Sequence, residues 1–372
     1  MLCVLSPISK GYRLTESVSG NAIQFAVLIC GVAVSFFPDE FDKVISPWLQ
    51  SKHPNISESH WPSNISKNTT AVGCHSHNGY WREVPLLSAL QAGCISIEAD
   101  IWLFDQAHQS QPGDLYVGHT TSSLRPHRTL RNMYIDPLVK LLDEKNPIAS
   151  FYSVVGQPPN GVFNGSPTQS LVLLVDIKTD STATWEYVVG SLAHLRQRGY
   201  LTYFNGVEVV NRPVTVVGTG NTPFNLVTAS QDYRDIFFDA PLHYLADSST
   251  TTTSSSTSSP RAPHDNSNAG QGLTGTSITT TPSSFNSTNS FYASTSFKDT
   301  IGLPRPFCLS MQQVDSIRAQ IRSAHRQGLK VRYWGVPGWP RALRDYIWGV
   351  LVREGVDVLN VDDLQSVSRI EG

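Results

Sequence analysis

The sequence predicts an α/β protein built on a (β/α)8 barrel of the TIM type. From residue 71 onward, short runs of β-branched residues alternate with helical patterns, which is typical of βαβ units in a parallel sheet. Eight such runs are present, and eight is the strand number of a closed barrel. No glycine-rich phosphate loop follows any of the runs, so a doubly wound open sheet is the less favoured architecture.

The expected elements follow one another in a regular order. We expect strands at 71–77, 94–103, 171–178, 213–219, 235–240, 291–297, 330–336 and 356–361. Helices are expected where apolar residues recur with a 3.6-residue period, and several of these segments end at a glycine. The helical sequences are REVPLLSALQAG, DPLVKLLDEK, ATWEYVVGSLAHLRQRG, SMQQVDSIRAQIRSAHRQG and RALRDYIWGVLVREG.

Three segments are expected to lie outside this α/β pattern. Residues 1–38 contain an uncharged stretch with an apolar core at 22–37, which suits a signal peptide or a membrane signal-anchor, with a buried helix as the alternative. Residues 39–70 read as a linker before a barrel over 71–366. Residues 248–290 are dominated by Ser and Thr and contain few large apolar side chains, so we expect a disordered insertion within the barrel.

Sequons for N-glycosylation are frequent along the chain. They begin at Asn55, Asn64, Asn68, Asn164 and Asn286. Together with the apolar N-terminus they favour a glycoprotein that is membrane-anchored or secreted, with its barrel on the luminal or extracellular side.

Composition excludes several classes of protein. With 40% hydrophobic and 16% charged residues, the chain is not a disordered one. A net charge of −2 gives no electrostatic footprint for nucleic acid. The five cysteines form no CxxC pair, which excludes a zinc ribbon and a thioredoxin-like motif. Cys74 and Cys94 fall on successive expected strands, where two buried thiols are favoured and a disulfide is the alternative.

Polar residues at the ends of the expected strands carry the chemistry. In a strand, residues i and i+2 face the same side. His75 and His77 form such a pair in CHSHNGYW, and Glu98 and Asp100 form another in SIEADIWL. Two carboxylates among buried isoleucines need a cation or basic partners, and oxygen ligands suit Mg²⁺ or Ca²⁺.

Two later motifs extend this set. His119 follows a short apolar run in DLYVGHTTS, and Asp176 and Lys178 end the run LVLLVDIKTD. A barrel of this type places its active site at the C-terminal strand ends, where all these residues fall. Three carboxylates for a divalent ion and two histidines for proton transfer fit the cleavage of a phosphodiester.

These motifs resemble those of the PLC-like and glycerophosphodiester phosphodiesterase superfamily. Within it, the chain is most similar to the fungal family called altered inheritance of mitochondria protein 6. The similar portions include SHNGYWREVPLLSALQAGCISIEADIWL, DLYVGHTTSSL, LLVDIKTD, FFDAPL, VRYWGVP and VDVLNVDDL, and they cover most of residues 71–363. The resemblance implies a metal-dependent phosphodiesterase whose substrate is a phospholipid or a glycerophosphodiester.

The resemblance also implies a role for individual residues. It assigns the two catalytic histidines, the metal-binding residues and the substrate contacts. The catalytic pair is His77 and His119, the metal group is Glu98, Asp100, Asp176 and Asn78, and the substrate contacts are Lys178 and Trp334. His75 is expected to have a supporting place beside His77.

The sequence departs from the family pattern in two places. Gly79 stands where many members have an aspartate, so any role of that carboxylate is missing. The insert DQAHQSQPG lengthens the spacing between Asp100 and His119, and His108 within it is a weaker rival to His119. Asp362 and the aspartate after it are expected to form a solvated turn at the rim.

Two alternative functions remain open at this stage. An amidohydrolase-type metal hydrolase also begins with HxH, but it needs further histidines at strand ends, and here His194 and His325 fall within expected helices. A barrel without catalysis that serves a binding or structural role is the other alternative, which Gly79 favours slightly and the two histidines disfavour.

Overall fold

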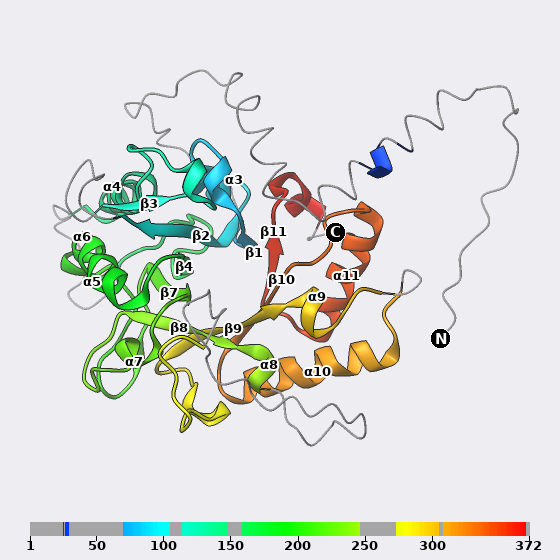
Figure 1. The fold of residues 1–372 in the computed structure, drawn as a ribbon. Coiled ribbons are helices and arrows are strands. Elements are labelled where there is room, and N and C mark those ends of the chain that lie inside the picture. The colour runs from blue at the N-terminus through cyan, green and yellow to red at the C-terminus, as the bar shows by residue number, and fades with distance from the viewer. Residues whose placement is uncertain are drawn as a thin grey trace, which may run out of the picture. The chain divides into compact units, whose positions relative to one another are not determined.

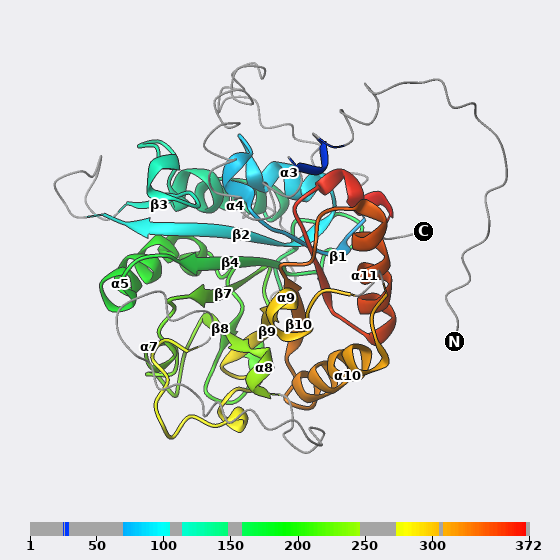
Figure 2. The ribbon, with the colours of Figure 1, turned by 45° about the vertical axis from the view of Figure 1, so that its right-hand side comes forward.

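Eight parallel strands close into a barrel in the computed structural model of the chain (Figures 1 and 2). The structure describes residues 25, 27–29, 70–104, 114–147, 158–245, 273–304 and 308–369. The strand order is β1-β11-β10-β9-β8-β7-β4-β2, and β1 pairs with β2 to close the ring. The strands are β1 Val72–Ser76, β2 Cys94–Leu103, β4 Leu171–Ile177, β7 Val214–Gly220, β8 Ile236–Pro241, β9 Ser290–Ser296, β10 Lys330–Trp334 and β11 Val358–Val361. The predicted fold class is confirmed, and the strand bounds differ from the expected ones by a few residues at most.

Helices connect the strands and lie outside the ring (Figure 2). They are α3 Pro85–Gln91, α4 Asp136–Lys145, α5 Ser181–Ser191, α6 Ala193–Gln197, α7 Phe224–Val227, α8 Leu242–Leu245, α9 Phe297–Thr300, α10 Met311–Arg326 and α11 Arg341–Glu354. The sequence marks several of the ends. A capping box between Ser310 and Gln313 begins α10, and Gly355 ends α11 with a φ of 96°, which a glycine adopts without strain.

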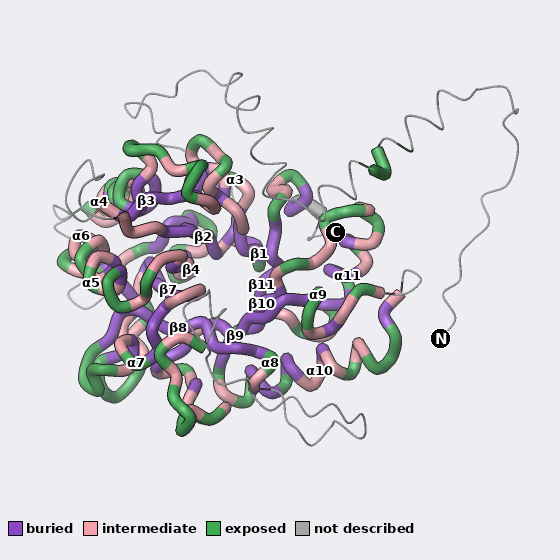
Figure 3. Tube along the Cα trace, viewed as in Figure 1, coloured by how far each residue is buried: buried purple, intermediate pink, exposed green. Residues whose placement is uncertain are grey.

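Alternation along the strands separates two apolar regions. In β4, Leu173 and Val175 face outward and pack in the large core beneath the helices, while Val172 and Leu174 face the barrel interior. Figure 3 shows the strands as buried and the outer helix surfaces as exposed. The small interior cluster also contains Val217, so apolar side chains fill part of the barrel and leave its C-terminal end to polar ones.

Among the described residues, three short strands lie outside the closed ring. Strand β3, Leu115–Val117, pairs antiparallel with the end of β2, where Ile101 lies opposite Val117. Strands β5, Tyr203–Phe204, and β6, Val209–Val210, form a separate antiparallel pair. Residue 119 lies two residues after β3, and the N–H of Gly118 before it donates to the carbonyl of Asp100 in β2.

A disulfide joins β1 to β2. Cys74 and Cys94 have Cα atoms 4.7 Å apart and both side chains are fully buried. The preference for two free thiols is therefore wrong. The two residues come together because β1 and β2 are neighbours in the closed ring.

Part of the expected disordered insertion at 248–290 has defined structure. Residues 273–289 form turns and a 3-10 helix at Pro282–Ser284, and residue 290 begins β9. Phe285 is buried and stacks on Phe238, with ring centroids 5.9 Å apart. The prediction of disorder is wrong for this part because one aromatic side chain anchors a segment that is otherwise poor in apolar residues.

Several predictions fall outside the described residues. They concern most of 1–38 and of the 39–70 linker, the first three sequons, His108, and residues 248–272. Within the described ranges, none of the helices combines the length and the apolar character that crossing a bilayer requires.

Candidate active site

Strand register brings the three predicted carboxylates together at the C-terminal end of the barrel. Glu98 and Asp100 share the inner face of β2, and Asp100 lies directly opposite Asp176 of β4. One ligand oxygen from each of the three lies within 4.8 Å of the others. Glu98 and Asp100 are buried, and Asp176 is half-buried. This cluster of hard oxygen donors is therefore able to hold a divalent cation.

The third carboxylate, Asp176, is bonded to Lys178 and packs against Gly220. The Lys178 ammonium donates a hydrogen bond to Asp176 Oδ2 at 2.6 Å and lies 3.8 Å from Asp100 Oδ2. Burial and the charges of Asp100 and Glu98 raise the pKa of Asp176 to about 6, although Lys178 opposes them. The other oxygen, Asp176 Oδ1, is buried and has no hydrogen-bond partner in the structure. It also occupies the space of a side chain at Gly220, where an added Cβ would lie 2.0 Å away.

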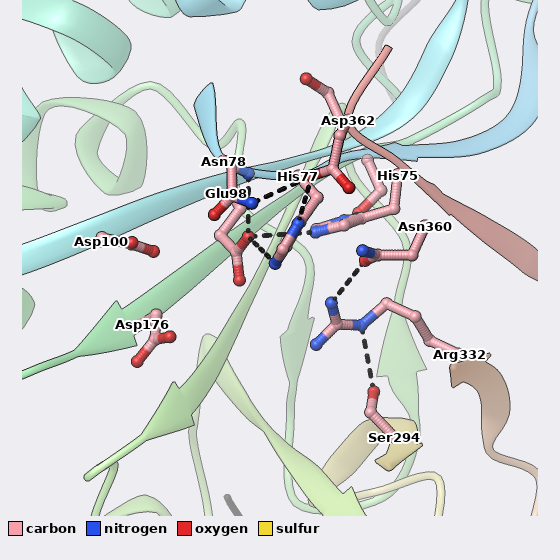
Figure 4. Close-up of polar contacts among 12 residues, drawn as sticks. His75, His77, Asn78, Glu98, Asp100, Asp176, Ser294, Arg332, Asn360 and Asp362 are labelled. Carbon is pink, nitrogen blue, oxygen red and sulfur yellow. Dashed lines mark hydrogen bonds and ion pairs between the residues drawn. The ribbon is translucent and has the colours of Figure 1, made fainter. Parts of the chain in front are cut away.

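The first predicted histidine contacts carboxylates through both ring nitrogens (Figure 4). His77 follows β1, and its Nδ1 lies 2.7 Å from Asp362 Oδ1 while its Nε2 lies 3.5 Å from Glu98 Oε2. Burial alone would lower the pKa of His77, but Glu98 and Asp362 outweigh it and raise the pKa to about 9. The pKa of Glu98 is correspondingly held well below its ordinary range by His77 and His75, against the effect of burial.

His75 has a different environment. It is fully buried, and its Nδ1 lies 2.7 Å from Ser96 Oγ. Burial, with the nearby charge of Arg332, lowers the pKa of His75 to about 4, so this ring is neutral at physiological pH. Among the described residues, the group of metal-ligating side chains that converges is the carboxylate cluster, and neither histidine of the HxH pair is part of it.

Asn78 contacts the carboxylate cluster through its backbone and the partner of His77 through its side chain. It adopts a left-handed conformation with φ 51° and ψ 43° at the start of the 3-10 turn Gly79–Trp81. Its backbone N–H points to Glu98 Oε2 at 3.4 Å, and its side-chain amide donates to Asp362 Oδ1 at 3.0 Å. The amide thus holds the same carboxylate that contacts His77.

The second predicted histidine joins the cluster from the other side. His119 Nδ1 lies 3.2 Å from Asp100 Oδ2, and about a third of its side chain is exposed. Its ring stacks on Tyr80, with centroids 5.1 Å apart and an interplanar angle of 18°. Asp100 therefore links His119 to the carboxylate cluster, as Glu98 links His77.

Trp334 lies at the same rim. It is the last residue of β10 and is half-buried. Alternation places it on the same side of the strand as Arg332, whose side chain points into the barrel (Figure 4).

Two site residues were missed by sequence reasoning. Asp362 lies in an exposed bend, as expected, but it is also the hydrogen-bond partner of His77. The charge of His77 and the hydrogen bonds from His77 and Asn78 lower the pKa of Asp362, against the effect of its partial burial. Arg332 is fully buried and contacts Ser294 Oγ at 3.1 Å, as well as side chains of β8 and β11. Its inward position in KVRYW was readable from strand alternation, but its partners were not.

The histidines required by the amidohydrolase alternative lie elsewhere. His194 is on α6, 3.7 Å from Asp136, and His325 is on α10, 2.8 Å from Asp357. Both are on outer helices, so they cannot complete a metal site at the strand ends.

Comparisons with known proteins agree with this architecture. A family model described as an AIM6-like phosphodiesterase domain matches residues 63–239. The altered inheritance of mitochondria protein 6 homolog of Arthroderma benhamiae is 37% identical over 316 residues, which cover 82% of this chain and 86% of the relative. The chain belongs to the altered inheritance of mitochondria protein 6 family. The recognition made from the sequence is thus confirmed.

Two further relatives match at lower identity. The Eremothecium gossypii protein is 32% identical over 306 residues, covering 79% of this chain and 68% of its own, and the Lachancea thermotolerans protein is 32% identical over 378 residues, covering 91% and 76%. No solved structure matches the chain. The family model includes His77, His119 and the three carboxylates, whereas Trp334 and Asp362 lie beyond its matched range.

Proposed function

We propose that this member of the family is a metal-dependent phosphoric diester hydrolase that acts on a phospholipid or a glycerophosphodiester by histidine acid/base catalysis. The observation that carries the proposal is the pairing of two histidines with one carboxylate cluster. His77 contacts the cluster through Glu98 at 3.5 Å, and His119 contacts it through Asp100 at 3.2 Å. Two proton-transfer groups on either side of a cation site are what cleavage of a phosphodiester requires.

The charge of the site supports a cation. Glu98, Asp100 and Asp176 face one another, and the positive groups in contact with them are the Lys178 ammonium and the His77 imidazolium. The Arg332 guanidinium adds positive charge nearby. A divalent cation among the three carboxylates would reduce their mutual repulsion and attract an anionic phosphodiester. Glu98, Asp100 and Asp176 would hold Mg²⁺ or Ca²⁺, which fits the buried oxygen of Asp176 that has no hydrogen-bond partner. When bound, such an ion neutralises the phosphate and stabilises the charge that develops in the transition state.

The remaining residues move or hold protons and position the substrate. In its neutral form, His77 would take the proton of the attacking hydroxyl at Nε2, while Asp362, bonded to Nδ1, holds the ring in the required tautomer. His119 would give a proton to the leaving oxygen. Lys178 would attract a phosphate oxygen as a point charge, and Trp334 would line the pocket. Whether the attacking hydroxyl comes from water or from the substrate itself, the same two histidines serve.

The location that we propose follows the secretory route. Buried disulfides such as Cys74–Cys94 form in oxidising compartments, and the sequons and the apolar N-terminus agree with that environment. The N-terminal segment would then anchor the barrel near a lipid surface. The relatives' name points instead to an association with mitochondria, which is the second candidate location.

A purified-barrel assay tests the proposed function. Bis-p-nitrophenyl phosphate and a panel of phospholipids and glycerophosphodiesters are offered with Mg²⁺, with Ca²⁺ or with EDTA. We expect hydrolysis that EDTA abolishes and that His77→Ala lowers by about a hundredfold or more. His325→Ala, on the outer helix, is the matched control and should retain activity. Activity that persists in EDTA or in His77→Ala would sink the mechanism, and a barrel inactive on every substrate would favour a binding role.

A further inference from the structure

The second histidine lies after a short strand outside the parallel ring. Strand β3 pairs antiparallel with residues 101–103 of β2, and His119, two residues after β3, contacts the ring through Asp100. His77, by contrast, follows a strand held on both sides by parallel neighbours. The distance between the two proposed proton-transfer groups therefore also depends on contacts between the loops that carry them.

The structure provides such contacts through the turn that follows His77. Tyr80, in the 3-10 turn, lays its ring on the His119 imidazole at 5.1 Å with an 18° tilt. Such near-parallel stacking restricts the direction in which the imidazole points. The turn thus begins two residues after His77 and contacts His119 through the Tyr80 ring.

Two arginines tie this turn to its surroundings. The Arg128 guanidinium donates to the carbonyls of Tyr80 and of Arg82, the latter at 2.8 Å. Arg128 is itself anchored to β3, because its carbonyl accepts from Val117 N–H at 2.8 Å. The side chain therefore reaches from the β3 segment, which positions His119, to the turn that follows His77.

The second arginine completes the connection to the far end of the chain. Arg82 donates to the carbonyl of Asp362 at 2.6 Å and, more weakly, to the carbonyl of His77 at 3.4 Å. It also donates to Ser76 Oγ at 3.0 Å. Arg82 therefore contacts the backbones of both His77 and Asp362. The carbonyl of Arg82 in turn accepts the hydrogen bond from Arg128.

We infer that Tyr80 and Arg128 are positioning residues that align the His119 imidazole with the leaving oxygen while His77 stays fixed on the barrel. The role of His119 as the acid rests on the proposed function, whereas the contacts of Tyr80 and Arg128 do not depend on it. The backbone N–H of His77 donates to the Val361 carbonyl at 3.0 Å, and Arg82 keeps its own hydrogen bonds to His77 and Asp362 when Arg128 is replaced. Loss of Tyr80 or of Arg128 should therefore leave the proton-accepting half of the site in place and misplace the proton-donating half.

Leaving-group dependence gives a readout that a purely structural role would not produce. p-Nitrophenolate leaves without protonation, whereas an alkoxide leaves only when an acid supplies a proton. Tyr80→Leu should therefore lower kcat about tenfold to a hundredfold on whichever of lysophosphatidylcholine, phosphatidylinositol and glycerophosphocholine the wild type cleaves. On bis-p-nitrophenyl phosphate the loss should be less than about threefold. Tyr80→Phe keeps the ring and should restore both rates.

Further variants guard against a trivial loss of folding. Arg128→Met should give the same leaving-group pattern, with KM nearly unchanged. Tyr233→Leu is the matched control, because it removes a tyrosine stacked on Tyr203 at the opposite end of the strands. It should leave both rates unchanged. Equal losses on both classes of substrate for Tyr80→Leu and Arg128→Met, or no loss on the alkyl substrates, would overturn the inference.

A spectroscopic measurement separates this inference from the proposed function. The ring protons of His119 in histidine-labelled protein should resonate upfield because of the Tyr80 ring, and they should move downfield in Tyr80→Leu but not in Tyr80→Phe. Unmoved signals would overturn the stacking contact whatever the activity. If the wild type cleaves no phosphodiester, the proposed function fails, and this shift alone decides whether Tyr80 orients His119.

Discussion

Replacing Asp362 by asparagine should lower the pKa of His77 in the cation-free protein. Asp362 Oδ1 lies 2.7 Å from Nδ1, and Glu98 Oε2 lies 3.5 Å from Nε2, so each ring nitrogen faces one carboxylate. Asparagine keeps the size of the side chain and removes its charge. The neighbouring change Asp363→Asn removes the same charge one residue along, where the carboxylate binds Ser366 instead of His77.

The size of the effect follows from the shift itself. The pKa of His77 rises from 6.5 to about 9, which corresponds to a preference of roughly 3 kcal/mol for the imidazolium. Glu98 is buried and contributes the larger Coulombic share, while 56% of the Asp362 side chain is exposed and screened by solvent. We therefore expect Asp362→Asn to lower the pKa by roughly one unit, and Asp363→Asn to leave it nearly unchanged.

The sign of the pH dependence is fixed by the direction of this shift. A pKa raised in the folded state stabilises the fold fully below pH 6.5, and this contribution is lost as the pH rises through about 9. Mg²⁺ bound at Glu98 would cancel part of the cause and lower the pKa, so that more of the His77 ring becomes a neutral base near pH 7. Metal binding would then be coupled to deprotonation of the His77 ring.

Nuclear magnetic resonance of labelled histidine measures this directly. His77 is titrated in EDTA, in saturating Mg²⁺, and in the two asparagine variants. A wild-type ring that titrates near 6.5 in EDTA would refute the reasoning, and so would a pKa that neither Mg²⁺ nor Asp362→Asn lowers.

Three further predictions concern stability and metal binding. Replacing Cys74 and Cys94 together by alanine should lower the free energy of unfolding by about 3 kcal/mol, because the unfolded chain gains conformational entropy when the loop across this sequence separation of 20 residues is no longer closed; an unchanged urea midpoint would contradict this. Asp176→Asn should weaken Mg²⁺ or Ca²⁺ binding about tenfold or more in calorimetry, since it removes one of three charged ligands, and equal affinity would exclude it as a ligand. Gly79→Asp should destabilise the fold by about 1–3 kcal/mol in thermal denaturation, because its Cβ would lie 3.1 Å from Pro85 Cβ and 3.2 Å from Tyr134 Oη; a stable variant would show that the turn has room for an aspartate.

Much of the barrel was predictable because its signals are local. A strand such as LVLLVDI is defined by neighbouring residues, and its alternation already states that Asp176 shares a face with Leu174. The same rule placed Glu98 and Asp100 together on β2. Where local signals are sparse, the prediction failed: Phe285 packs on Phe224 and Phe238, which are distant in the chain, and so anchors a Ser/Thr-rich segment.

The sequence by itself determined the fold class, the three carboxylates and the two histidines, since each depends on periodicity within one strand or on a short motif at its end. Only the tertiary structure decided the partner of His77, because Asp362 lies 285 residues away and reaches it only when β11 closes against β1. The same closure placed Cys74 beside Cys94. The tertiary structure also showed that the Tyr80 ring contacts His119. These two residues lie on separate loops, and no periodic pattern in the sequence relates their positions, so no local pattern could have indicated the contact.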